Sequence, residues 1–181
     1  MIIPKKLKKG DTIGVVAPSN PIIGENIEEL EKAKKMLERD GYKVVFSENI
    51  FSNANEYSAT AKEKANDINE MFANKDIDMI WCAKGGENSN SVFDYLDFEI
   101  IKNNPKIIAG FSDITSIINV IANKTGLVTF SATNFKTVAT DETDYSYKQA
   151  IARFSGENAT FDVAKKDCYK TIKKGATEGE L

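Results

Sequence analysis

Hydrophobic residues along this chain gather in short runs that are separated by longer stretches of mixed polarity. The runs are rich in valine and isoleucine and end near glycine or proline, which is typical of buried strands. We therefore predict five strands, at residues 12–17, 43–46, 77–83, 106–110 and 127–130.

The stretches between these runs carry apolar residues every three or four positions, the spacing of one face of an α-helix. Residues 26–41 form the first predicted helix, with Asn26 as a suitable N-cap and a glycine at its end. The second, at residues 60–76, opens on Thr60 and carries Glu63 at the spacing of a capping box. Two further helical segments are predicted, at residues 92–104 and 113–124.

Strands that alternate with helices form βαβ units and a mostly parallel sheet with helices on both faces. The expected fold class is therefore α/β, a three-layer sandwich of the flavodoxin-like or class I amidotransferase-like kind. Ligands of such sheets bind beyond the carboxyl ends of the strands. We expect three loops to meet at that edge, at residues 18–26, 84–91 and 111–113.

The composition of the chain indicates a folded protein and argues against nucleic-acid and membrane partners. Hydrophobic residues make up 41% of the 181 positions, enough for a packed core. The net charge is −3 and the lysines are scattered among acids, so we expect no nucleic-acid partner. No apolar run approaches the roughly 20 residues that span a bilayer, and the amino terminus lacks the apolar core of a signal peptide. A cytoplasmic protein without a membrane partner is expected.

The chain contains no histidine. Any Ser-His-Asp, Cys-His or histidine-metal arrangement is therefore excluded within these residues alone. The two cysteines, Cys82 and Cys168, lie far apart and show no pattern of a disulfide framework or a zinc site.

Ser112 stands where a predicted strand passes into a predicted helix. A serine in such a turn is exposed, and the N–H of the next residue can stabilise an oxyanion, so Ser112 is a candidate nucleophile. The turn differs from the elbow of α/β-hydrolases, since the position two residues after the serine is Ile114 instead of glycine. The alternative is a helix cap, which the local spacing favours.

Two other loops carry candidate binding groups. Gly85 and Gly86 follow the third predicted strand, where glycine lets the backbone approach a ligand and N–H groups can hold an anion. Their spacing matches neither a P-loop nor the dinucleotide fingerprint, and a plain turn is the alternative. Ser19 follows the first strand and could contact a ligand, the alternative being a proline-stiffened turn.

Taken together, three segments resemble the LD-carboxypeptidase family of serine peptidases. They are "APSNP", "KGGENSNSVFDYLDFEIIKNNPKIIAGFSDIT" and "KTGLVTF", in this order on alternating strands and helices. The resemblance covers most of residues 1–135. The stretch that begins at Gly85 looks closer to the microcin-immunity branch than to the cell-wall branch.

The resemblance implies a role for each matching residue. Ser112 corresponds to the nucleophile, and the backbone N–H groups of Asp113 and Gly86 correspond to the oxyanion hole. The substrate side would be lined by Gly85, Ser19, Glu87, Asn88 and Ser89. Neither a metal nor another cofactor is implied.

The family's activity would then be expected here. Members cleave an amide bond next to a free carboxylate, either the L,D bond of muropeptides in peptidoglycan recycling or a peptidyl-nucleotide antibiotic in microcin immunity. The implied partner is thus a small peptide or peptidyl nucleotide. Relatives are often dimers, so a homodimer is one candidate assembly, and the sequence does not fix the oligomeric state.

The chain also departs from the family pattern. The family's glutamate and histidine lie in a second domain, so residues 1–135 correspond to the nucleophile-bearing domain and 136–181 to a linker and the start of a domain absent from this chain. We expect this fragment alone to be inactive. The family's Gly-Pro step after the fifth strand is replaced by Ser131-Ala132-Thr133-Asn134. The alternative function is a non-catalytic α/β ligand-binding domain in which Ser112 only caps its helix.

Overall fold

The structure, a computed structural model, describes residues 1–54, 58–140, 144–156 and 175. Its strands are β1 (Thr12–Val16), β2 (Lys43–Phe46), β3 (Met79–Cys82), β4 (Ile107–Gly110) and β5 (Phe130–Ser131). Its helices are α1 (Glu25–Arg39), α2 (Ala61–Ala73), α3 (Phe98–Asn103), α4 (Ile114–Thr125), α5 (Thr137–Thr140), α6 (Tyr145–Ser155) and the 3₁₀ helix η2 (Ser89–Tyr95).

The five strands form one sheet in the order β2-β1-β3-β4-β5, and every neighbouring pair is parallel. This is the flavodoxin-like strand order, in which β2 is added on one side of β1 and the later strands are added on the other side. The predicted α/β class is confirmed. Because Val15 pairs with Phe46 on one side and Trp81 on the other, the carboxyl ends of these three strands lie level.

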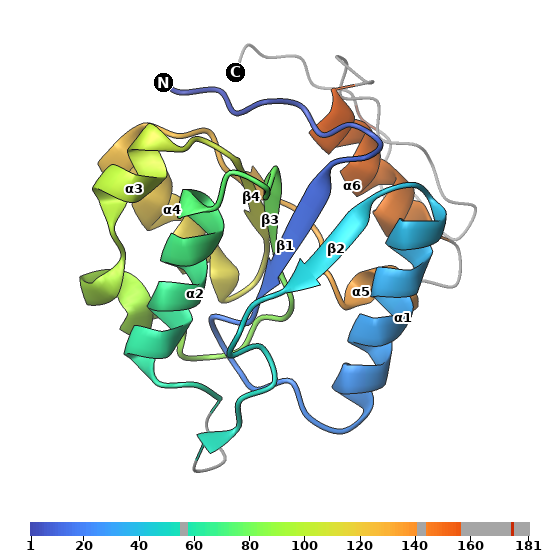
Figure 1. Ribbon diagram of the computed structural model, residues 1–181, viewed down its shortest axis with the longest axis horizontal. Helices are drawn as coiled ribbons and strands as arrows, with labels where there is room; N and C mark the ends of the chain where they lie inside the picture. The colour runs from blue at the N-terminus through green and yellow to red at the C-terminus, as the bar shows by residue number, and fades with distance from the viewer. Residues whose placement is uncertain (55–57, 141–143, 157–174, 176–181) are drawn as a thin grey trace.

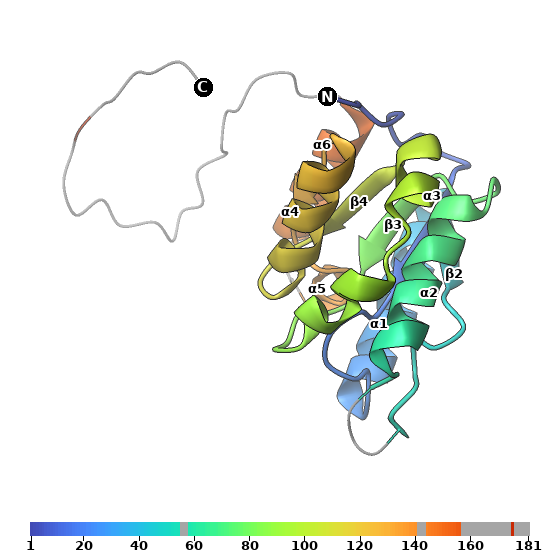
Figure 2. The same ribbon diagram turned by 90° about the vertical axis from the view of Figure 1, so that its left-hand side faces the viewer.

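Helices cover both faces of the sheet, as Figures 1 and 2 show. Helices α1, α5 and α6 bury their apolar side chains against one face, and α2, α3, α4 and η2 cover the other. Trp81 of β3 is fully buried at the centre of the first core, with Phe135 and Phe154 packed edge-on against its ring at 5.7 and 5.2 Å. These aromatic contacts fix the segment after β5 onto the sheet.

The ends of several elements differ from the prediction. Helix α1 begins at Glu25 after Gly24, whose positive φ of 55° suits glycine, so Asn26 is not its N-cap. The predicted capping box of α2, between Thr60 and Glu63, is present. The predicted strand at 127–130 shortens to β5, because Leu127 pairs instead with Ile2 of the amino-terminal segment.

Residues beyond the predicted domain boundary at 135 continue the same core. Helix α5 packs on α1, α6 packs on α5, and Val138 and Phe154 are buried. The described residues just after 135 thus share the core of the residues before it, and the domain boundary itself stays a prediction. Most of the predicted linker and second-domain start lies outside the described residues.

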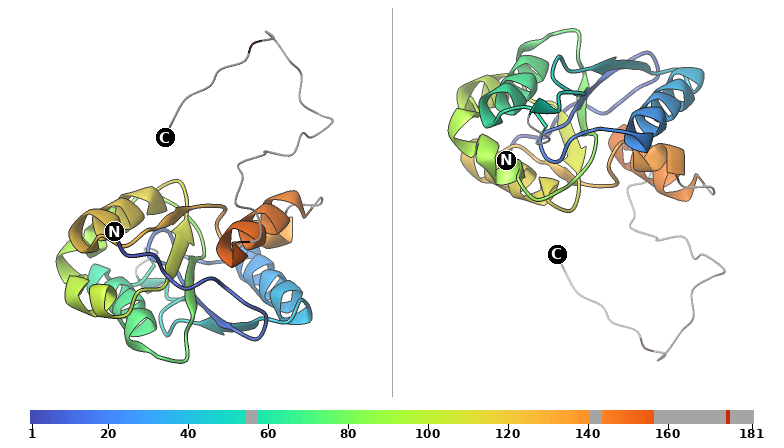
Figure 3. Two further views of the ribbon diagram at one scale, coloured as in Figure 1. Left: turned by 90° about the horizontal axis from the view of Figure 1, so that it is seen from above. Right: turned by 90° about the horizontal axis from the view of Figure 1, so that it is seen from below.

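The amino-terminal segment runs across the amino ends of the strands, as the view from above in Figure 3 shows. It is held there by the pairing of Ile2 with Leu127 and by a hydrogen bond from the Leu7 N–H to the Phe154 carbonyl. Within the described residues, no helix combines the length and apolar character that crossing a bilayer requires.

Candidate active site

Three loops meet at the carboxyl edge of the sheet, as their topology predicts. They follow β1, β3 and β4, and together with the segment after β5 they border a cleft of ≈ 340 Å³. Its wall includes Ser112, Gly85, Gly86, Lys84, Asn134 and Lys136. The edge opposite the amino terminus therefore carries the candidate chemistry.

Ser112 occupies the turn between β4 and α4 in a left-handed conformation, with φ of 64°. A serine held at positive φ costs of order 1–3 kcal/mol, and such strained residues cluster at functional sites. The residue is exposed to solvent. Its hydroxyl makes no hydrogen bond with any described residue, and the N-cap position of α4 belongs to Asp113. The hydroxyl is thus presented to the cleft and does not cap the helix.

Gly85 lies directly against this serine. A Cβ added to Gly85 would stand 3.2 Å from the Ser112 Cβ and 3.4 Å from its Oγ. The N–H groups of Gly86 and Asp113 donate to no group among the described residues, whereas the Glu87 N–H is taken by the side chain of Asn20 at 3.2 Å. Two amides that donate to no described group therefore belong to the two loops that carry Gly85 and Ser112.

The Asp113 side chain ties the three loops together. Its carboxylate accepts a hydrogen bond from the Ser19 hydroxyl at 2.5 Å and another from the Ser89 N–H at 2.9 Å. Burial alone would raise the pKa of Asp113, but these hydrogen bonds outweigh it and hold the pKa below its usual value. The carboxylate is consequently ionised at neutral pH and serves as a brace beneath the site.

A buried lysine supports the glycine turn from below. Lys64, in the first turn of α2, is only 3% exposed and donates to the Asn88 side-chain oxygen at 2.5 Å. The Asn88 amide in turn donates to the Asn20 oxygen that also receives the Glu87 N–H. Burial lowers the pKa of Lys64, and the nearby charge of Asp113 partly opposes this.

Asn134 holds the backbone just before the serine. Its side-chain oxygen accepts from the Phe111 N–H at 3.0 Å, and its amide lies 3.5 Å from the Phe111 carbonyl. Asn134 itself is positioned by Trp81, whose indole N–H donates to the Thr133 carbonyl at 2.7 Å. The core thereby fixes the turn that carries Ser112.

Two lysines line the cleft, and they differ in their partners. Lys136 is paired with Glu29 at 2.6 Å and also donates to Asn26. Lys84 forms no ion pair with any described carboxylate. Among the residues that the structure describes, this lysine is thus a cation without a paired acid, next to Gly85 in the cleft wall.

The residues predicted to bind substrate fall into two groups. Gly85, Gly86 and Glu87 border the cleft. Ser19 and Ser89 are fully buried, the Ser19 hydroxyl bonded to the Asp113 carboxylate and the Ser89 hydroxyl to the Asp113 carbonyl, and their contact with substrate stays a prediction. Asn88 is half-buried and faces Asn20 and Lys64.

Comparison with known proteins identifies the family of this chain. Residues 13–132 match the model of the family described as "LD-carboxypeptidase N-terminal domain". The putative carboxypeptidase YocD of Bacillus subtilis is 42% identical over 135 residues, which are 74% of this chain and 41% of that protein. The microcin self-immunity protein MccF of Escherichia coli is 39% identical over 130 residues, 71% of this chain and 38% of that protein.

A solved structure agrees with these sequence matches. MccF in complex with aspartyl sulfamoyl adenosine superposes with a TM-score of 0.81 at 33% identity, covering 86% of this chain and 47% of that chain. The chain thus spans less than half the length of these relatives. This chain belongs to the LD-carboxypeptidase family, because the matched stretch runs from β1 through the Ser112 turn to the segment after β5.

Proposed function

We propose that this chain is the nucleophile-bearing part of a serine-type carboxypeptidase that hydrolyses an amide bond next to a free carboxylate. The observation that carries the proposal is Ser112, which is exposed at positive φ beside the glycine turn and whose hydroxyl is bonded to none of the described residues. Membership of a carboxypeptidase family agrees with it. One solved MccF structure is described as an active-site mutant in which a serine, an asparagine and a lysine are each changed to alanine.

The Ser112 oxygen would attack the scissile carbonyl carbon while its proton passes to a base. The developing oxyanion would be held by the N–H groups of Gly86 and Asp113, and losing one such donor typically costs ~10²–10³ in kcat. Collapse of the tetrahedral intermediate would release the amine and leave an acyl-serine, which water then hydrolyses. Because the chain has no histidine, we propose that a glutamate and a histidine outside it supply the base, as the family resemblance implies.

The substrate we propose is a small peptide or peptidyl nucleotide with a free carboxylate. MccF structures hold aspartyl sulfamoyl adenosine and glutamyl sulfamoyl guanosine. A further relative, 34% identical over 151 residues, is described as a probable murein peptide carboxypeptidase of Bacillus subtilis. Lys84, without a carboxylate partner among the described residues, would attract the carboxylate of either substrate.

Hydrolysis by a completed enzyme tests the proposal. A chimaera would join this chain, through α6, to the remaining part of Escherichia coli MccF, and cleavage of a muropeptide and an aminoacyl sulfamoyl nucleotide would be followed by mass spectrometry. We expect cleavage by the chimaera, none by the 181-residue chain alone, and loss by at least about 10³-fold in Ser112→Ala. Ser131→Ala, at an exposed position of β5, is the matched control and should stay active. Equal activity of the Ser112→Ala chimaera would contradict the assignment.

A further inference from the structure

We propose that a second cleft, at the amino ends of the strands, binds a small polyphosphate anion such as the phosphate chain of a nucleoside triphosphate. This cleft has a volume of ≈ 660 Å³ and lies at the edge of the sheet away from Ser112. Its charged lining residues are Lys5, Lys6, Lys8, Lys75, Lys106, Asp11 and Asp78.

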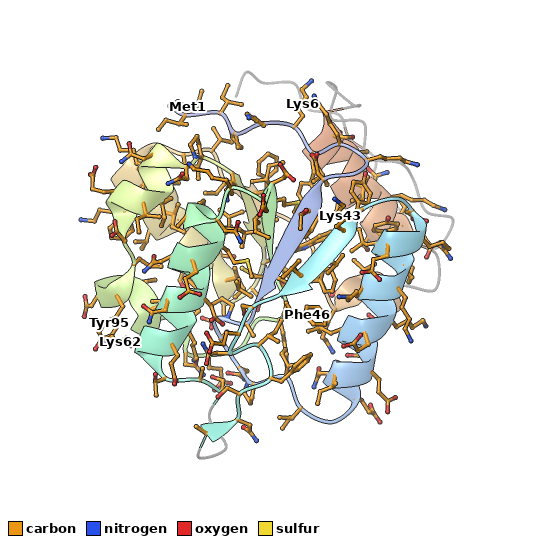
Figure 4. The ribbon with its side chains drawn as sticks, viewed as in Figure 1. Met1, Lys6, Lys43, Phe46, Lys62 and Tyr95 are labelled. Carbon is orange, nitrogen blue, oxygen red and sulfur yellow. The ribbon has the colours of Figure 1, made fainter. Side chains whose placement is uncertain are left out.

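Three segments build the cleft. They are the amino-terminal segment before β1, the loop between α2 and β3, and the loop between α3 and β4. Figure 3 shows the amino-terminal segment crossing the strand ends, and Figure 4 shows the Lys6 side chain at this end of the molecule. The hydrogen bonds that hold the amino-terminal segment also shape one wall of the cleft.

The charges in this cleft are unbalanced. Five lysines face two aspartates, in a protein whose net charge is −3. None of these lysines forms an ion pair with a carboxylate of the described ranges. Each aspartate already accepts a backbone hydrogen bond, Asp11 from the Lys8 N–H and Asp78 from the Thr12 N–H. The concentrated positive charge therefore favours a multiply charged anion.

One lysine of this cleft, Lys106, is buried instead of lying on the surface. Its side chain is 8% exposed and donates to the carbonyl groups of Met71 and Asn74 at the end of α2. Burial, with the repulsion of Lys75, lowers its pKa to about 8, while Asp78 opposes the shift. An anion in the cleft would compensate this buried positive charge.

The type of cation and the uncharged lining suggest the ligand class. The cationic side chains that line the cleft are all lysines, and lysine ammonium groups bind phosphate as point charges, whereas planar carboxylate recognition favours arginine. The amides of Asn103 and Asn104 and the apolar side chains of Ile3, Ile77 and Pro105 complete the lining. A cleft of this size lies within the ~300–1,000 Å³ range of small-molecule sites.

Isothermal titration of the 181-residue chain with ATP, tripolyphosphate and adenosine tests the proposal. ATP and tripolyphosphate should bind with one-site saturation that weakens as salt is added, and adenosine should not. Tighter binding of ATP than of tripolyphosphate would assign the apolar lining to the nucleoside. The variant Lys5→Gln/Lys8→Gln/Lys75→Gln should bind about tenfold more weakly, because three exposed charges are removed.

The matched control is Lys32→Gln/Lys35→Gln/Lys62→Gln, which removes exposed lysines outside the cleft and should bind like the parent. Near pH 8, binding should also take up protons as Lys106 becomes charged, so the measured heat should change with the buffer's ionisation enthalpy. Ser112→Ala should bind ATP unchanged, which separates this site from the proposed peptidase. Absence of saturable binding, or equal weakening by the control variant, would overturn the proposal.

Discussion

The two neighbouring glycines of the β3 loop should respond very differently to the same substitution. A Cβ at Gly86 would lie 2.3 Å from the Asn20 Cγ and Oδ1 and 2.5 Å from the Ser19 Oγ. Ser19 is fully buried and bonded to Asp113, so it has little room to move. The Gly86→Ala variant must therefore push Asn20 out of place.

The cost of displacing Asn20 can be worked out from its contacts. Its side-chain oxygen accepts from the Glu87 N–H and from the Asn88 amide, and each of these bonds contributes about 1 kcal/mol. Overpacking adds about 1–3 kcal/mol. We expect Gly86→Ala to lower the free energy of unfolding by ~3–5 kcal/mol, the sum of the two lost bonds and the overpacking.

Gly85→Ala is the matched control. Its Cβ would lie 3.2 Å from the Ser112 Cβ, 3.4 Å from the Ser112 Oγ and 3.5 Å from the Phe111 carbonyl oxygen, so the exposed serine turn needs to give by only a few tenths of an ångström. An alanine also restricts the unfolded chain, so stability should change by less than about 1 kcal/mol while the new methyl crowds the serine oxygen. Urea unfolding followed by the fluorescence of Trp81, the sole tryptophan, measures both variants. Equal stability of Gly86→Ala and the parent would refute this reasoning.

Three further predictions follow from the same contacts. Asn134→Ala leaves the Phe111 N–H without its partner and should cost about 1–3 kcal/mol in urea unfolding, whereas Asn119→Ala, at an exposed position of α4, should cost less than about 0.5. The pKa of Asp113 is lower in the folded chain than in the unfolded chain. Its carboxylate therefore stabilises the fold at pH values above the unfolded pKa of about 4, and this stabilisation is lost as the pH falls through the folded pKa. Asp113→Asn should lower the free energy of unfolding at neutral pH, by a margin that shrinks in acid, as urea unfolding at several pH values would measure. The folded pKa of Lys106 is about 8, below its unfolded value, so between these two values the folded chain binds fewer protons than the unfolded chain. Stability should therefore rise from pH 8 towards 10, and Lys106→Met should remove that rise; a parent whose stability stays flat over this range would contradict the lowered pKa.

The predictable part of the fold rests on local and periodic signals. The alternation of apolar runs with amphipathic stretches was enough for the α/β class, and the Thr60–Glu63 spacing was enough for the α2 cap. The topology rule for parallel sheets also brought the Ser19, Gly85 and Ser112 loops to one edge. Each of these inferences uses residues close in sequence or a rule that holds for every such sheet.

The unpredicted part depends on contacts between distant residues. Lys64 looks like an ordinary exposed helix lysine until the loop at Asn88 covers it, and Asn134 acquires its role only because Trp81 anchors the neighbouring carbonyl. The burial of Ser19 follows from its bond to Asp113, 94 positions away. No local signal could have indicated these partners, although a lysine so early in an amphipathic helix could have been examined as a buried cation.

Covalent labelling of the chimaera, in which the remaining part of MccF supplies the base, tests most directly whether Ser112 is presented for nucleophilic attack. A fluorophosphonate places phosphorus where the scissile carbonyl would lie, and loss of fluoride leaves an adduct on the attacking oxygen that peptide mass spectrometry can locate. We predict that Ser112 reacts faster than the exposed Ser131, and that Gly85→Ala slows the reaction at Ser112 alone. Labelling of Ser112 no faster than Ser131 would contradict the account.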